Sequence, residues 1–454
     1  MKKLLFSISI IFLTASLCVG AQELIDGSGM FDNPAMVKEE IIEEMPPSMD
    51  SLFLESDKVV IRGQFSLDGG IDWRKASADN LQYSAKLRLT LDARPDKNYR
   101  AYAKIDSFYP TISESETASP MSFDPSLSVK ELYADTNWGD TLYLRAGKQT
   151  IAWGVGRYFS PADVLNLTAI DIEDPDAERY GPVALKINIP EKLNNFYGYV
   201  IANDISSAND LAYAVKAEFL VGETEFAIAG FYRQGMAPRA IAMVTFPVGA
   251  MDFYAEAVAA LGSDKTFLDG IGGTYIDKTS LIFQATAGFS YKYTDPLENW
   301  NISATGQFWY NGEGYEDPAI ARISKTDPLM TSHTILPGDL LHPDRYYAVA
   351  SLGLSDIYKS GFNISALWFG ALGGETGKIT PIISHSSEDL TVSFKAPINY
   401  GPVKAEYAPF GCMVTPTVEL KLLGTTISAG VPLSSNVAWD LPLVITFGFS
   451  KAVF

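Results

Sequence analysis

The sequence predicts an all-β protein, a transmembrane antiparallel β-barrel of about 18 strands, with 16–20 strands acceptable. Three observations favour this fold class. Apolar and polar side chains alternate over stretches of about a dozen residues, as in long strands. Tyrosine, phenylalanine and glycine are abundant, at 23, 25 and 36 residues. Beyond the N-terminal segment, no run approaches the roughly 18 apolar residues of a membrane-spanning helix.

The N-terminus has the composition of a secretory signal peptide. Met1, Lys2 and Lys3 form a basic start, residues 4–17 are apolar, and a run of small residues ends at Ala21. We expect cleavage after Ala21, so that the signal peptide spans residues 1–21. Together with the strand pattern, this signal predicts location in a bacterial outer membrane.

Residues 22–57 form an acidic leader that differs in composition from the rest of the chain. Residues 34–45 could form one short helix, which Pro46 and Pro47 would stop. The leader is interpreted either as a solvated periplasmic tail or as a plug at one end of the barrel. The barrel itself is expected to span residues 58–454.

Alternation is strongest from residue 58 onward. In 81–94, for example, Leu87 and Leu89 share one face while Lys86 and Arg88 share the other. The same pattern recurs in segments 58–73, 210–222, 280–293 and 301–311. These segments are long enough for the roughly 9–11 residues with which a tilted strand crosses a bilayer. A soluble sandwich or propeller also has alternating strands, but hides the apolar face inside.

Turns and loops suggest a barrel with two unlike ends. Short turns are expected at 137–140 and 221–223, and long polar loops at about 154–181 and 312–343. Short periplasmic turns and long loops, either extracellular or folded inward, are typical of outer-membrane barrels. Aromatic residues near the segment ends would form girdles at both membrane interfaces: Trp73, Tyr83, Tyr99, Trp138, Tyr291, Trp300 and Tyr310.

The C-terminal stretch ends in Phe454, similar to the terminal aromatic signal that the barrel-assembly machinery reads. The alternating residues before it, including Phe447 and Phe449, are one register away from Phe454. A β-bulge near Ser450 is expected to reconcile the two registers.

The segment "ELYADTNWGDTLYLRAGKQTIAWGVGRYFSPADVLN", with its continuation to about residue 190, resembles the DUF1302 outer-membrane proteins, a porin-like family distantly akin to alginate-export barrels. The resemblance lies in a hairpin followed by Gly-Lys-Gln, Trp-Gly and Ala-Asp-Val-Leu-Asn, here at 147–149, 153–154 and 162–166. The family often has proline after the asparagine, where this chain has Leu167. The resemblance implies an outer-membrane barrel that acts as a channel, with no particular solute.

A strand is expected over 141–152, sending Tyr143, Arg145 and Gly147 inward. The loop after it is rich in apolar anchors, so we expect it to fold into the lumen and narrow the pore. Its constriction residues would be Trp153, Arg157, Tyr158, Phe159 and Asp163. The alternative is a structural lid packed over the barrel mouth.

Inward-facing cations concentrate in the early strands and are predicted to line the pore and set its selectivity: Arg62, Lys86, Arg88, Arg100, Lys104 and Arg145, with Arg94 beside them. This basic ladder would favour anions, because charges at close quarters govern selectivity. The alternative is that acidic neighbours, Asp68, Asp72, Asp92, Asp106, Glu131 and Asp135, pair with the cations and form a neutral, rigid wall.

The net charge of −19 excludes nucleic acid as a partner. The histidines are scattered, and no Gly-x-Ser-x-Gly motif occurs, so an enzyme, a cofactor and a metal site are not expected. The sequence predicts a porin-like channel for passive diffusion of small hydrophilic solutes, with anion preference as a hypothesis. A surface-binding or adhesin-type barrel with an occluded lumen is the alternative. The expected partners of the predicted channel are outer-membrane lipid, the barrel-assembly machinery and small hydrophilic solutes. Whether the chain forms a homo-oligomer is left open.

Overall fold

The computed structural model describes residues 55–56, 58–71, 81–109, 126–203, 205–323, 327–387, 390–409, 411–422, 425–430, 433–434 and 444–452. The expected signal peptide, the acidic leader before Glu55 and the terminal Phe454 lie outside these residues. Asp72 and Trp73 also lie outside them.

More than half of the described chain belongs to one antiparallel sheet of 24 strand segments, several only two or three residues long. The segments are β1 (Glu55–Ser56), β2 (Val59–Ile71), β3 (Leu81–Asp96), β4 (Tyr99–Tyr109), β5 (Ser126–Trp138), β6 (Leu142–Lys148), β7 (Val183–Glu191), β8 (Asn194–Ile201), β9 (Ala212–Val221), β10 (Thr224–Arg233), β11 (Arg239–Val248), β12 (Met251–Leu261), β15 (Leu281–Thr294), β16 (Asn301–Asn311), β17 (Tyr346–Ser355), β18 (Phe362–Ala371), β19 (Thr376–Ser386), β20 (Leu390–Lys395), β21 (Ile398–Tyr400), β22 (Met413–Val414), β23 (Thr417–Leu422), β24 (Thr425–Gly430), β25 (Leu433–Ser434) and β26 (Val444–Ala452).

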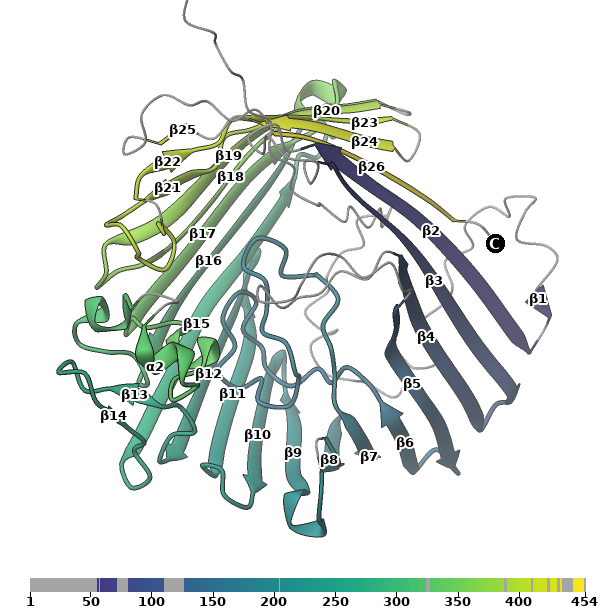
Figure 1. Ribbon diagram of the computed structural model, residues 1–454. Helices are drawn as coiled ribbons and strands as arrows, with labels where there is room; N and C mark the ends of the chain where they lie inside the picture. The colour runs from purple at the N-terminus through teal and green to yellow at the C-terminus, as the bar shows by residue number, and fades with distance from the viewer. Residues whose placement is uncertain are drawn as a thin grey trace, which may run out of the picture.

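Each long strand pairs with the next long strand along the chain, from β2 to β12 and from β12 through β15 to β19. Strands β20, β23 and β24 continue this order to β26. Strand β26 pairs with β2, so that the succession of pairings returns to its start. Figure 1 shows the strongly curved sheet that results. The all-β antiparallel class is therefore confirmed.

The two faces of the sheet differ as the alternation predicts. Along β3, Lys86 and Arg88 lie on the inner face, whereas Leu87 and Leu89 lie on the outer face and are 37 % and 39 % exposed. Exposed apolar side chains recur on this outer face in strand after strand: Leu132, Leu185, Val215, Ile228, Phe283, Leu352, Ile364, Phe394 and Val418. The large buried side chains instead cluster inside the curve of the sheet.

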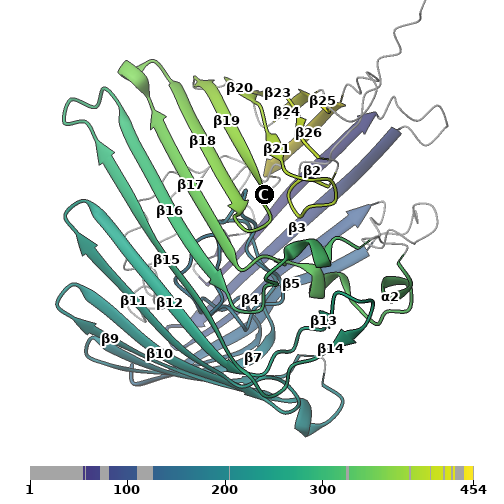
Figure 2. The same ribbon diagram turned by 90° about the vertical axis from the view of Figure 1, so that its left-hand side faces the viewer.

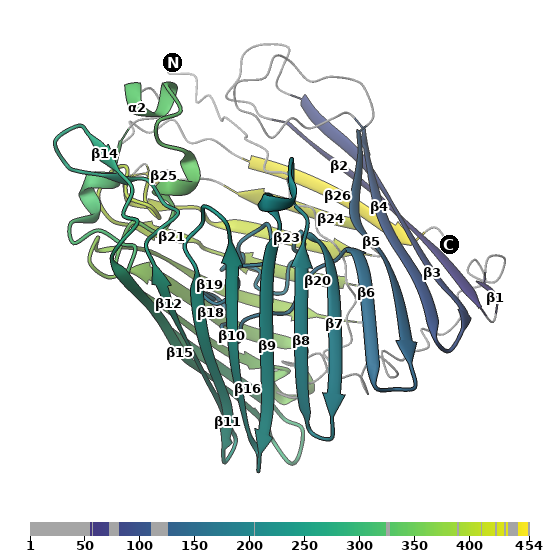
Figure 3. The ribbon, with the colours of Figure 1, turned by 90° about the horizontal axis from the view of Figure 1, so that it is seen from below.

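The two ends of the sheet are also unlike. Short turns join β5 to β6, β7 to β8 and β9 to β10, whereas long connections follow β6, β12 and β16 at the other end. The turns predicted at 137–140 and 221–223 are therefore confirmed. Figure 2 shows the connections after β12 and β16, which contain β13, β14 and α2, together at one end of the strands, and Figure 3 shows the same end from below.

Two expectations about strands were wrong. Strand β6 ends at Lys148 and does not continue to residue 152, because the chain there leaves the sheet. No register shift occurs near Ser450, which pairs with Ser66 in a continuous register from Ile445 to Ala452.

A small lobe, which we call the cap, lies at the long-loop ends of β12 and β16 (Figure 2). It contains the two-stranded sheet of β13 (Phe267–Leu268) and β14 (Thr274–Tyr275), with the helices η4 (Pro318–Ala321), α2 (Pro328–Thr331) and η5 (Pro337–Leu340). Phe267, Tyr315 and Ile335 form its own apolar core. Two further 3₁₀ turns are η3 (Ala208–Asp210) and η6 (Ile357–Lys359).

Candidate functional site

The connection between β6 and β7, residues 149–182, folds back inside the curve of the sheet, and we call it the inner loop. It is the coil in the middle of Figure 1. Backbone N–H of Gln149 donates to the carbonyl of Pro182 at 3.0 Å, so the two ends of the loop lie side by side. A Cβ on Gly181 would lie 1.7 Å from the carbonyl oxygen of Gln149, so only glycine permits this approach.

The departure from the sheet is fixed at Gly147, whose φ of +133° is a conformation that other residues rarely adopt. A Cβ there would lie 2.1 Å from the carbonyl oxygen of Leu132 on the neighbouring strand. This glycine of the Gly-Lys-Gln motif therefore lets β6 end while it is still pressed against β5.

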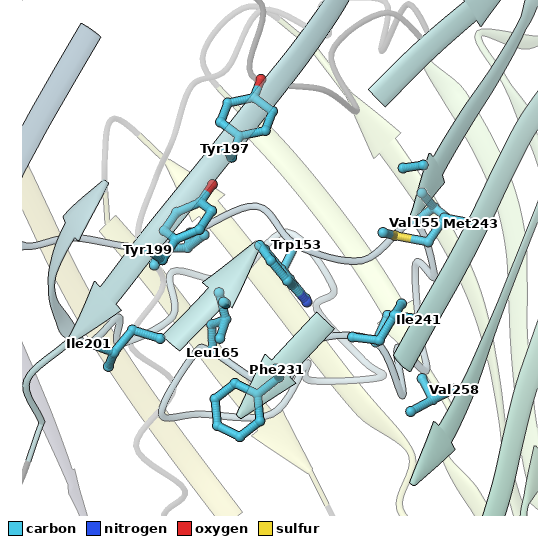
Figure 4. Packing of buried hydrophobic residues seen from close by; sticks show 14 of the residues in the cluster. Trp153, Val155, Leu165, Tyr197, Tyr199, Ile201, Phe231, Ile241, Met243 and Val258 are labelled. Atoms are coloured by element: carbon cyan, nitrogen blue, oxygen red, sulfur yellow. The ribbon is translucent and has the colours of Figure 1, made fainter. Parts of the chain in front are cut away.

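The first anchor of the inner loop is Trp153, which is 1 % exposed. Its ring meets the ring of Tyr199 on β8 edge to face, with 5.2 Å between centroids. Figure 4 shows Trp153 among Leu165 of the same loop and Phe231 and Ile241 of the sheet. Alanines line the same part of the inner wall, and their small side chains leave room for the indole ring: Ala212, Ala214 and Ala227.

A buried carboxylate holds the next part of the loop. Glu256 on β12 is 2 % exposed and accepts backbone N–H bonds from Val155 at 2.7 Å, Gly156 at 3.0 Å and Ala162 at 3.1 Å. These N–H groups would otherwise be buried without partners at the turn of the loop. A Cβ on Gly156 would lie 2.0 Å from the carbonyl oxygen of Phe159, so the tight turn requires glycine.

The second anchor is aromatic. Phe159 stacks on Trp309 of β16 at 5.0 Å and contacts the ring of Tyr347 of β17 at 5.5 Å. Gln307 accepts the N–H of Tyr158 at 2.8 Å and donates to the carbonyl of Phe159 at 2.5 Å. The side chain of Gln307 thus binds the backbone of residues 158 and 159 to the inner face of β16.

The two limbs of the loop are clamped to each other near its base. Asn166 exchanges hydrogen bonds with both backbone groups of Ile151, at 3.0 and 2.7 Å, and also donates to Asp163 at 2.8 Å. Asp163 forms an ion pair with Arg179 of the returning limb. Burial raises the pKa of the Asp163 carboxyl, and the ion pair with Arg179 opposes that shift.

The acidic limb of the loop, residues 168–180, is held by ion pairs to strands far apart in the sheet. Glu178 meets Arg88 at 2.6 Å and Lys104 at 2.8 Å, whereas Glu173 meets Lys378 of β19 at 2.5 Å. Burial tends to raise the pKa of Glu178, but the bond from Lys104 and the charge of Arg88 outweigh it, so the pKa lies below its ordinary value. The loop therefore spans the interior between β3 and β19.

The predicted constriction residues share this loop but differ in environment. Trp153, Tyr158 and Phe159 are buried against the inner wall. Asp163 is buried in the clamp, whereas Arg157 pairs with Asp176 at 2.9 Å on the more open side. The structure brings all five into one segment inside the sheet.

The predicted ladder cations do line the inner face, but carboxylates accompany most of them. Asp106 pairs with Arg88 at 2.7 Å and with Lys86 at 3.2 Å. The remaining contacts are Arg100 with Asp92 at 2.9 Å, Arg94 with Asp92 at 3.0 Å, Arg145 with Asp135 at 2.6 Å and Lys104 with Glu131 at 3.5 Å. Arg62 lies opposite Thr90 on the same face and is exposed. This pairing agrees with the paired-wall alternative at Asp92, Asp106, Glu131 and Asp135.

Sequence reasoning missed the residues that receive the loop, chiefly Glu256, Gln307 and Lys378. One signal was available: Glu256 is a lone carboxylate among small and apolar residues in "YAEAVAAL". Such a residue at an inward position calls for a partner. Among the described residues, His, Cys, Asp and Glu form no group of three that could hold a metal ion.

No helix in the described part of the chain is long and apolar enough to cross a membrane. No family model matches the sequence, and no curated protein matches it either. Solved structures with a similar backbone include Pseudomonas aeruginosa OccK8 (OprE), at 8 % identity and a TM-score of 0.43, covering 87 % of this chain and 98 % of that one. Acinetobacter baumannii OccAB1 has 12 % identity and a TM-score of 0.41, with coverage of 90 % and 100 %. A BenF-like porin from Pseudomonas fluorescens Pf-5 has 9 % identity and a TM-score of 0.40, with coverage of 88 % and 99 %. These values describe a loose resemblance and assign the chain to no family.

Proposed function

We propose that this chain is a porin-like channel of the bacterial outer membrane, through which small hydrophilic solutes diffuse passively. The observation that carries the proposal is the inverted distribution of side chains. Exposed residues such as Val215, Ile228 and Leu352 make the outer face apolar around the sheet, while buried polar residues such as Lys216, Glu256 and Gln307 lie on its inner face. An apolar outer face and polar residues on the inner face support a barrel in lipid over a soluble sandwich, which hides its apolar face inside.

Strand length and pairing support a transmembrane barrel. Strands β4, β12 and β16 each have 11 residues, and β9 and β10 have 10, which matches the roughly 9–11 residues that cross a bilayer. The pairing of β26 with β2 supports closure of the sheet into a barrel, because an open edge would leave backbone groups unsatisfied in lipid. The strand number of about 18 and cleavage after Ala21 remain predictions.

The inner loop is proposed to form the constriction of this channel. Its buried anchors hold it against β8, β12 and β16, and its acidic limb reaches β3 and β19. Because the loop is fixed to several strands, it is proposed to narrow the lumen permanently and not to act as a moving gate. Trp153, Tyr158 and Phe159 serve this role as anchors, Asp163 holds the base of the loop through Arg179, and Arg157 is the charged group on the more open side.

We propose that the channel has only a weak preference for anions. Arg88 and Lys104 are partly neutralised by Asp106, Glu131 and Glu178, so the ladder is a mixed wall. Cations that share a carboxylate, such as Arg94 and Arg100 on Asp92, keep a local excess of positive charge near the turn end. A weak preference for anions follows from this excess.

Membership of the DUF1302 family, recognition of Phe454 by the barrel-assembly machinery and a homo-oligomeric state are proposals of the same kind. The glycine of the Gly-Lys-Gln motif, the Trp-Gly pair and Asn166 each have a structural task at the start of the inner loop, which supports reading the motif as a loop-folding signature.

The alternative is a surface-binding or adhesin-type barrel with an occluded lumen. The many contacts of the inner loop and the cap at the long-loop end favour it. Both functions predict the same barrel, and they differ in whether water and solutes pass.

Swelling of liposomes separates the two functions. Vesicles that contain the refolded mature chain are diluted into iso-osmotic arabinose or stachyose. A channel predicts swelling that is fast with the pentose and slow with the tetrasaccharide, because the constriction sorts solutes by size. Equal absence of swelling in both sugars would contradict the channel and favour the occluded barrel.

A further inference from the structure

A cavity of about 490 Å³ lies on the inner side of the sheet, where turns join β3 to β4 and β5 to β6. Strand β1 and these turns are at the lower right of Figure 1. Lys58, the residue before β2, lines the cavity, and its carbonyl accepts the backbone N–H of Arg94 at 2.7 Å. Strand β1 pairs with Val59 and Val60 at the start of β2. The acidic leader therefore joins the barrel beside this cavity.

The guanidinium groups of the cavity wall are paired with carboxylates. Asp92 accepts two hydrogen bonds from Arg100, at 2.9 and 3.1 Å, and two from Arg94, at 3.3 and 3.0 Å. Asp135 accepts two from Arg145, at 2.6 and 3.2 Å, and lies 4.0 Å from a guanidinium nitrogen of Arg100. These arginines therefore form a fixed and partly neutralised wall.

Two lysines at the same cavity differ from the arginines. Lys58 and Lys97 both line it and are exposed. Within the part of the chain that the structure describes, neither of them forms an ion pair. The carboxylate of Asp96, next to Lys97, accepts the backbone N–H of Asn98 at 2.7 Å and so stabilises the β3–β4 turn. The two ammonium groups can therefore meet an acidic segment from outside the described residues.

The charge of the whole wall is positive. The lining cations are Lys58, Arg94, Lys97, Arg100, Arg145 and Lys186. We leave Lys186 out of the count, because it has other interactions, among them one with the ring of Tyr197 at 5.1 Å. The other five cations face four carboxylates, which are those of Asp92, Asp96, Asp135 and Asp140. Asp140 is included because it accepts the hydroxyl of the lining residue Tyr143 at 3.3 Å. One positive charge remains in excess by this count.

The leader carries the opposite charge. Residues 22–57 contain ten acidic residues and one lysine, Lys38, so that their net charge is −10 + 1 = −9. Seven of the acids lie in the stretch that precedes Lys58: Glu39, Glu40, Glu43, Glu44, Asp50, Glu55 and Asp57. A confined wall with an excess of cations attracts such a segment, and the chain connection keeps the segment nearby.

The other cations inside the barrel suit the leader less well. Lys86 and Arg88 share Asp106, and Arg88 and Lys104 both meet Glu178 of the inner loop. The acidic limb of that loop would repel a second acidic segment at this place. No residue of the inner loop lines the cavity at the turn end, so a leader bound there avoids contact with the acidic limb.

We propose that the acidic leader, chiefly residues 39–54, docks over this cavity and binds Lys58 and Lys97 at the turn end of the barrel. The leader is then neither a solvated tail nor a plug of the constriction. The inference rests on the proposed function in one respect, because a docked leader would narrow the turn-end mouth of a conducting pore. Docking itself needs no open channel.

Carbodiimide cross-linking of the full mature chain in detergent tests the contact, because this reagent joins a carboxylate to an amine only when the two touch. Peptide mass spectrometry compares the links from the leader to Lys97 with those to Lys192, an exposed lysine in the β7–β8 turn at the same end. We expect at least about fivefold more links to Lys97, and loss of most of this difference in about 1 M salt, where charges are screened beyond about 3 Å.

Trypsin cleavage after Lys38 provides a second measurement. The charge reversal Lys58→Glu/Lys97→Glu should release the leader and speed cleavage at Lys38 severalfold, because proteolysis follows the population of the undocked form. Lys192→Glu is the matched control and should be cleaved at the rate of the wild type.

Equal yields of links to Lys97 and Lys192, or equal cleavage of all three proteins, would overturn the docking and show a solvated tail. Links mainly to Lys86 or Lys104 would overturn the location and show a plug at the constriction. A folded and inserted chain that links to Lys97 but never conducts would refute the channel and support the docking.

Discussion

The carboxylate of Glu256, in the middle of β12, accepts the backbone N–H of Val155 at 2.7 Å across a sequence separation of 101 residues. The same side chain receives the N–H groups of Gly156 and Ala162. One inward-facing acid thereby holds the turn of a loop that begins after β6, six strands before β12 in the chain.

Replacement of Glu256 should loosen the inner loop in a graded way. Leucine removes all acceptors and leaves three buried N–H groups unsatisfied, at a cost of about 1–3 kcal/mol each. Glutamine keeps one acceptor and should have an intermediate effect. Trypsin cleavage after Arg157, inside the loop, should be fastest in Glu256→Leu and slower in Glu256→Gln. Glu223→Gln, in the exposed β9–β10 turn, is the control and should match the wild type. Equal cleavage of all variants would refute the anchor.

Gly156→Ala should disturb the same turn for a steric reason. The new Cβ would lie 2.0 Å from the carbonyl oxygen of Phe159, so the stack of Phe159 on Trp309 must shift. We expect a lower temperature of heat-induced loss of the folded, gel-shifted species and a changed near-UV circular dichroism signal. Gly198→Ala on β8 has no atom within 4 Å of its Cβ and should change neither signal. Identical signals for both variants would count against the described turn.

Acid should release the acidic limb of the inner loop. The pKa of Glu178 is depressed in the folded chain below its ordinary value of 4.5. The ion pairs with Arg88 and Lys104 therefore contribute stability above about pH 4.5, and this contribution is lost as the pH falls through the lower folded-state pKa. Current fluctuations in planar bilayers should grow over that acid range in the wild type. In Glu178→Gln they should be large already at neutral pH. A wild type with the same current fluctuations at pH 7 and pH 3 would contradict the proposal that the Glu178 ion pairs hold the acidic limb.

Selectivity should respond to the paired cations. In Arg88→Gln/Arg100→Gln, Asp106 and Asp92 lose their closest guanidinium partners and leave the wall more negative. The reversal potential in a salt gradient should shift toward cations. Lys192→Gln, in the exposed β7–β8 turn, is the control and should leave it unchanged. No shift in the double variant would show that these residues do not govern permeation.

The alternation of side chains predicted the strands because each one has two unlike faces. In β3 the period of two persists as far as Ala93, where the register with β4 shifts, and both β3 and β9 appear where expected. The prediction overran β6 because no residue between 149 and 152 marks locally where the chain leaves the sheet; Ile151 and Trp153 already belong to the inner loop. Their partners are Asn166 and Tyr199, which no local pattern could supply.

Of the candidate site, only the residues of the inner loop could be predicted from the sequence, and not the strand residues that they contact. The density of anchors in "IAWGVGRYF" indicates burial, but the wall that receives them is set by sheet register. Phe159 reaches Trp309 and Tyr158 reaches Gln307 because β16 stands opposite the loop, about 150 residues along the chain. Likewise, the basic ladder was visible in sequence, whereas its neutralisation by Asp106 requires that Arg88 and Asp106 be register partners in β3 and β4.

The most direct test of the central claim, a water-filled channel narrowed by the inner loop, is single-channel conductance in planar bilayers. The refolded mature chain and the Glu256→Leu variant are compared in the same salt solution. The account predicts steady open-channel steps for the wild type and larger or noisier steps for the variant. No steps from either protein, with both folded and inserted, would contradict the channel.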